Sequence, residues 1–122
     1  MNDKADGANN ELALLKAFRA GMIKRHFGIY IDSPGVTEQG LDEAELAAQG
    51  LKALRPKGIH ALEPLLDDPD PGVRSGAGDY LMHELPGKAI PVLEALGSSA
   101  ELEASQTARV ALWFYHRDKS IN

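Results

Sequence analysis

Apolar residues recur at helical spacing along most of the chain, with breaker residues between the runs. In the first run Leu15, Phe18 and Met22 lie three and four positions apart, which is the spacing of one helix face. Asn10 is suited to the N-cap of this helix, and the pattern continues to about Tyr30. We therefore predict one long helix between these two residues.

A second helix is predicted between two groups of breaker residues. Residues 32–35 read Asp-Ser-Pro-Gly and residues 55–58 read Arg-Pro-Lys-Gly, and both groups interrupt a helical pattern. The helix is expected to begin between Glu38 and Asp42. Its expected buried residues are Leu46, Leu51 and Leu54.

Prolines and glycines divide the second half of the chain into four shorter helices. The first, over 59–66, contains Pro64, which removes one hydrogen bond and should bend the helix or move its start towards Ala61. Asp70 and Pro71 are suited to the N-cap and first position of the next helix. The Pro-Gly pair at 86–87 should end it.

The last two helices are bounded in the same way. One is expected over 88–96, ended by Gly97. Ser98 and Glu101 form a capping-box pattern for the other, which should run to about His116. No segment shows the alternation of a strand, so the fold class is all-α, with about six helices in three antiparallel hairpins.

A repeat relates the two hairpins of the second half. A shift of 31 positions places residues 59–82 on residues 90–113 without a gap. The coinciding apolar pairs are Ile59 and Ile90, Leu62 and Leu93, Leu65 and Leu96, Ala77 and Ala108, and Leu81 and Leu112. Because neither hairpin can bury its apolar face alone, the repeat predicts an α-α superhelix, a short solenoid.

Domain boundaries follow from the same pattern. The polar residues 1–9 are expected to be a disordered tail, and residues 10–122 a single helical-repeat domain. Within it we expect a divergent capping hairpin over 10–56 and two repeats, over 58–86 and 88–117.

One turn carries a family resemblance. The run 65–74, Leu-Leu-Asp-Asp-Pro-Asp-Pro-Gly-Val-Arg, with Ala77 and Leu81 after it, resembles the inter-helix turn and second helix of a HEAT-like repeat of the PBS-lyase type. From about residue 11 the chain is similar to a small bacterial family of HEAT-like domains of unknown function. The second unit keeps the apolar spacing but lacks the Asp-Pro and Val-Arg elements. The resemblance implies protein–protein contact more often than catalysis, and it implies no cofactor.

Composition narrows the function further. The chain has 122 residues, 13 Lys and Arg against 18 Asp and Glu, a net charge of −5 and no cysteine. An acidic chain is a poor phosphate binder, so nucleic acid is not expected as the partner. Without cysteine there is no disulfide or thiolate site. The absence of a signal-like or spanning apolar run predicts a cytoplasmic protein with no membrane contact.

No catalytic or metal site is predicted. Prolines separate the carboxylates of 67–70, so we interpret this run as a capped turn and not as a calcium loop. His83-Glu84 begins like a zinc-protease motif, but the second histidine is missing. Asp79 and His83 share a helix face at i, i+4, although no nucleophile accompanies them.

The expected binding surface is the concave ridge that second helices form in stacked hairpins. Its outward residues should be Arg74, Ser75, Asp79, Met82, His83, Gln106, Arg109 and Trp113. The shift of 31 positions brings Trp113 beside Met82, and Trp and Arg are frequent binding hot spots. One alternative stays open, in which Trp113 packs under the C-terminal residues 117–122.

Together these patterns predict a non-enzymatic protein–protein interaction module, monomeric or weakly dimeric, with an inhibitor or immunity-like role as one form of it. The alternative is a HEAT-like enzyme or enzyme accessory, related to lyases or DNA-repair proteins, with a small-molecule or nucleic-acid site.

Overall fold

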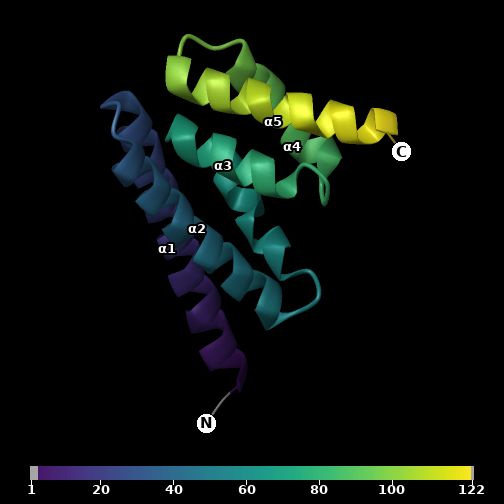
Figure 1. Ribbon diagram of the computed structural model, residues 1–122. Helices are drawn as coiled ribbons and strands as arrows, with labels where there is room; N and C mark the ends of the chain where they lie inside the picture. Colours follow the sequence, from purple (N-terminus) through teal and green to yellow (C-terminus); the bar gives the residue numbers. More distant parts are fainter. Residues whose placement is uncertain (1–2, 122) are drawn as a thin grey trace. The chain divides into compact units, whose positions relative to one another are not determined.

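Every regular element of the computed structural model is a helix within the residues it describes, which are 3–121 for the backbone and 10–119 for the side chains (Figure 1). The all-α prediction is confirmed. In order the elements are α1 (Asp3–Tyr30), α2 (Pro34–Leu54), the 3-10 helix η1 (Gly58–Asp67), α3 (Pro71–Leu81), α4 (Pro86–Gly97) and α5 (Leu102–Ile121).

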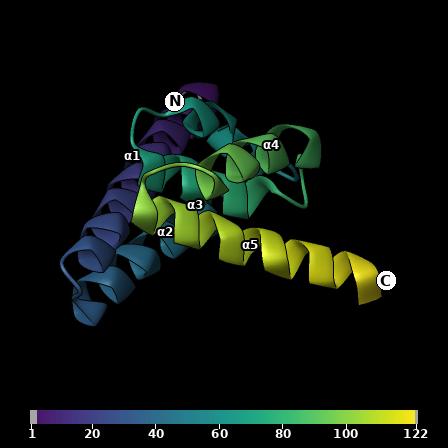
Figure 2. The ribbon, with the colours of Figure 1, turned by 90° about the horizontal axis from the view of Figure 1, so that it is seen from above.

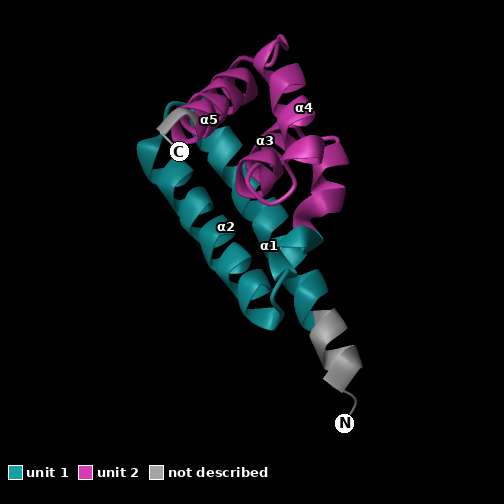
Figure 3. Cartoon of the chain, turned by 90° about the vertical axis from the view of Figure 1, so that its right-hand side faces the viewer, with its two compact units in different colours: residues 1–61 teal, residues 62–122 magenta. Residues whose placement is uncertain are grey.

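The chain divides into two compact units, residues 1–61 and residues 62–122 (Figure 3). The first contains α1, α2 and the start of η1. The second contains the rest of η1 with α3, α4 and α5.

The first unit is built on an antiparallel hairpin of α1 and α2, which lie side by side in both ribbon views (Figures 1 and 2). Helix α1 ends at Tyr30, as predicted, but it begins at Asp3. Asn10 therefore lies inside the helix and is not its N-cap, because no proline interrupts the residues before it. Of the disordered tail predicted over 1–9, the backbone of residues 3–9 is the start of α1, and residues 1–2 lie outside the described part.

Helix α2 begins at Pro34, several residues before the predicted range. Ser33 is its N-cap, with the hydroxyl oxygen accepting from the Val36 amide at 3.4 Å. Pro34 takes the first helical position, where its missing N–H costs nothing and its fixed φ suits the helix. The breaker group at 32–35 is thus a helix start.

The turn between the two helices holds one residue in the left-handed region. Asp32 has φ 56°. Its amide donates to Ile29 O at 3.1 Å, and the Ser33 amide donates to Gly28 O at 2.8 Å. These two bonds are the Schellman motif, which caps the last carbonyls of α1 and places Asp32 where glycine is preferred.

Asp32→Gly is therefore expected to stabilise the protein by about 0.5–1 kcal/mol, because glycine adopts this φ without steric cost. Asp32→Val should destabilise it by about 1–2 kcal/mol, since a β-branched residue pays the full left-handed penalty. Urea unfolding of both variants checks this. Equal urea midpoints for the two variants would show that the left-handed φ at position 32 does not affect stability.

The main chains of α1 and α2 approach closely at glycines. A Cβ on Gly40 would collide with the Arg25 amide nitrogen and lie 2.6 Å from Gly21 O, while one on Gly21 would lie 2.7 Å from Ala44 N. Small side chains occupy the same face of α2 further on. The buried residues of α2 are Gly40, Ala44, Ala47, Ala48 and Leu51.

The residues that α2 buries differ in part from its predicted core. Leu51 is fully buried, but Leu46 is 69% exposed and Leu54 is 37% exposed. The leucines at 46 and 54 lie outside the row of small residues that packs the hairpin. On α1, Phe18 and Met22 are buried as predicted, and Leu15 is half-buried.

The second unit begins in η1, which is a 3-10 helix where an α-helix was predicted. Pro64 accounts for the difference, because its ring would clash with the carbonyl four residues earlier in an α-helix. Helix α3 then starts as predicted. Asp70 is its N-cap, accepting from the Val73 amide at 3.0 Å, and Pro71 is its first residue.

The boundaries of α4 and α5 differ from the prediction. Helix α3 already ends at Leu81, and Pro86 is the first residue of α4 instead of a stop for α3. The capping box at Ser98 is not formed, because the Ser98 amide caps the end of α4 by donating to Glu94 O at 3.3 Å. Helix α5 runs on to Ile121.

The 31-residue register holds within the second unit. Helix α3 begins at Pro71 and α5 at Leu102, which are 31 positions apart. Two of the five paired positions match in burial, Leu62 with Leu93 and Ala77 with Ala108, all at 0% exposure, whereas each of the other three pairs joins a buried residue to a half-buried one. Helix α3 packs against α4 and α5, and α4 packs against α5.

Candidate functional site

Two of the residues predicted to face outward are buried. Ser75 is 1% exposed and Met82 is 6% exposed. Helix α3 carries small buried residues around most of its circumference, so it offers little free surface. The Ser75 hydroxyl has no hydrogen-bond partner within the described part of the chain. The ridge predicted from α3 is therefore incomplete.

Two arginines that were predicted to line the ridge instead stabilise turns through hydrogen bonds to the main chain. The Arg74 Nη1 group donates to Asp68 O at 2.9 Å and to Pro69 O at 3.2 Å, across the turn before α3. The Arg109 Nε group donates to Gly97 O at 2.8 Å, at the end of α4. Each guanidinium donates to main-chain carbonyls at or just after the end of a helix, which ties neighbouring elements together.

The remaining residues of the predicted set lie at the surface. His83 is exposed, and its ring centroid lies 5.2 Å from that of Tyr115 on α5. Asp79 is half-buried on α3, whereas His83 lies beyond the end of that helix at Leu81, so the two do not share a helix face as predicted; Gln106 is exposed.

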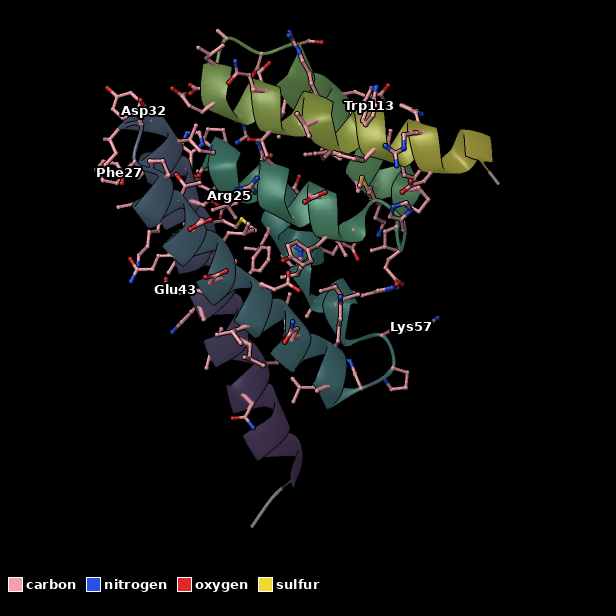
Figure 4. The ribbon with its side chains drawn as sticks, viewed as in Figure 1. Arg25, Phe27, Asp32, Glu43, Lys57 and Trp113 are labelled. Atoms are coloured by element: carbon pink, nitrogen blue, oxygen red, sulfur yellow. The ribbon has the colours of Figure 1, made fainter. Side chains whose placement is uncertain are left out.

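Trp113 is 57% exposed on α5 (Figure 4). Of residues 117–122, which the alternative placed over the indole, Arg117 does lie 5.3 Å from its centroid, while the backbone of 118–121 continues as helix.

An exposed aromatic cluster surrounds Trp113. Phe114 is 46% exposed and Val110 is 56% exposed. The Trp113 and Phe114 rings meet edge to face, with centroids 4.9 Å apart at 81°. The Arg117 guanidinium lies 5.3 Å from the Trp113 centroid and 5.6 Å from the Phe114 centroid, within cation–π range of both. We call Arg109, Val110, Trp113, Phe114 and Arg117 the α5 face.

The α5 face carries two arginines and no carboxylate of its own, with Glu103 and Asp118 just beyond the two ends of this stretch of α5. Between Ala104 and Arg117 the sequence has no Asp or Glu, although the chain as a whole carries a net charge of −5. The two arginines lie eight positions apart, at the two ends of the apolar group. The face therefore combines large apolar area with positive charge at its ends.

Sequence reasoning missed three members of this face: Val110, Phe114 and Arg117. Their signal is present, since positions 110, 113, 114 and 117 follow the i, i+3, i+4, i+7 spacing of a helix stripe. The buried face of α5 is a separate stripe of Ala104, Ala108, Ala111 and Tyr115. The buried stripe belongs to the side of α5 that packs within the second unit, and the large side chains of the other stripe remain exposed.

A hollow in the first unit carries no comparable chemistry. It has a volume of about 280 Å³ and is lined by Ser33 and Thr37, among others. Both hydroxyls serve the cap of α2: the Thr37 hydroxyl donates to Ser33 O at 2.9 Å, and Ser33 Oγ accepts from Val36 N.

The described residues lack two further kinds of feature. No group of three His, Asp or Glu side chains among them could hold a metal ion. None of the helices they form combines the length and apolar character of a membrane span.

No protein-family model matches the chain, and no curated protein or solved structure matches it.

Proposed function

We propose that this chain is a non-enzymatic protein-binding module that holds its partner on the α5 face. The observation that carries the proposal is the group of three large apolar side chains, Val110, Trp113 and Phe114, each about half exposed and next to one another on a single helix. Interface cores are enriched in aromatic residues and arginine, and a few such residues supply most of the binding energy.

A HEAT-like architecture is part of this proposal. It is supported by the common register of α3 and α5 and by the matching burial of Leu62 with Leu93. Repeats of this kind present helix surfaces to protein partners. We also propose a bacterial, cytoplasmic setting, since a chain without cysteine does not depend on an oxidising compartment.

Co-purification from native cell lysate tests the proposal. The tagged wild type is compared with a Trp113→Ala, Phe114→Ala double variant, and retained proteins are identified by mass spectrometry. Loss of two anchor side chains, each worth about 2 kcal/mol or more at a hot spot, should remove a micromolar partner from the double variant.

Leu46→Ala is the matched control, because Leu46 is the more exposed side chain at 69% and lies on another helix. It should retain the partner. Circular dichroism establishes that all three proteins are folded. A partner that binds the double variant as well as the wild type, or no specific partner at all, would refute the proposal.

A further inference from the structure

We draw no further inference here: the strongest candidate, the exposed apolar stripe of Val110, Trp113 and Phe114 on α5, belongs to the binding surface already proposed, and nothing in the structure shows what covers it.

Discussion

Gly40→Ala is expected to lower the free energy of unfolding by about 2 kcal/mol. The new Cβ would lie 2.6 Å from Gly21 O and collide with the Arg25 amide nitrogen, and both are main-chain atoms of α1 that no side-chain rotation can move. Alanine gains about 1 kcal/mol over glycine in helix propensity, which offsets only part of the cost of separating two packed helices. Urea unfolding followed by circular dichroism measures the difference.

Gly35→Ala is the control for propensity alone. Gly35 lies in the first turn of the same helix, and a Cβ there would meet nothing within 4 Å. This variant should match the wild type or exceed it by up to about 1 kcal/mol. If both alanine variants shift stability in the same direction by similar amounts, the close approach of α1 and α2 is not what requires glycine at position 40.

Leu93→Ala is expected to cost about 3 kcal/mol, in the range for a fully buried leucine whose removal leaves a cavity. Leu93 is 0% exposed, and its Cδ2 would lie 2.8 Å from a Cβ placed on Gly78. The two positions therefore compete for the same space between α3 and α4. Thermal and urea unfolding of the single variant, with Leu46→Ala as the exposed control, checks the size of the effect.

A double-mutant cycle makes the prediction specific. Gly78→Ala alone should be near neutral or destabilising by about 1 kcal/mol, because the Leu93 side chain has to move. In the Leu93→Ala background the same substitution should instead stabilise by about 1 kcal/mol, since it gains helix propensity and fills part of the cavity. Strict additivity of the two changes would show that Gly78 and Leu93 do not share this space.

The candidate site was partly visible in the sequence. Trp113 and Arg109 were predicted to lie at the surface, and both do. Ser75 and Met82 were placed on the same ridge and are buried. The prediction assumed that α3 has one inner face. Small residues let a helix pack on several sides. The apolar periodicity of the sequence does not reveal how many sides of a helix are covered.

The sequence by itself determined the features that depend on local chemistry. Asp70 and Pro71 predicted the start of α3, and the breaker group at 55–58 predicted the end of α2. These signals act between residues a few positions apart, so they need no tertiary partner. The register of α3 and α5 was visible in the apolar spacing that the two repeats share, although the second lacks the Asp-Pro start of the first.

Only the tertiary structure decided which side of each helix is covered. Glycines and alanines, not Leu46, form the inner face of α2, because Gly40 lets the main chain of α1 come within contact distance. Likewise, α5 buries its alanines and leaves Trp113 and Phe114 exposed. Burial depends on what lies opposite each side chain, and that partner is distant in sequence, so hydrophobicity alone does not reveal it.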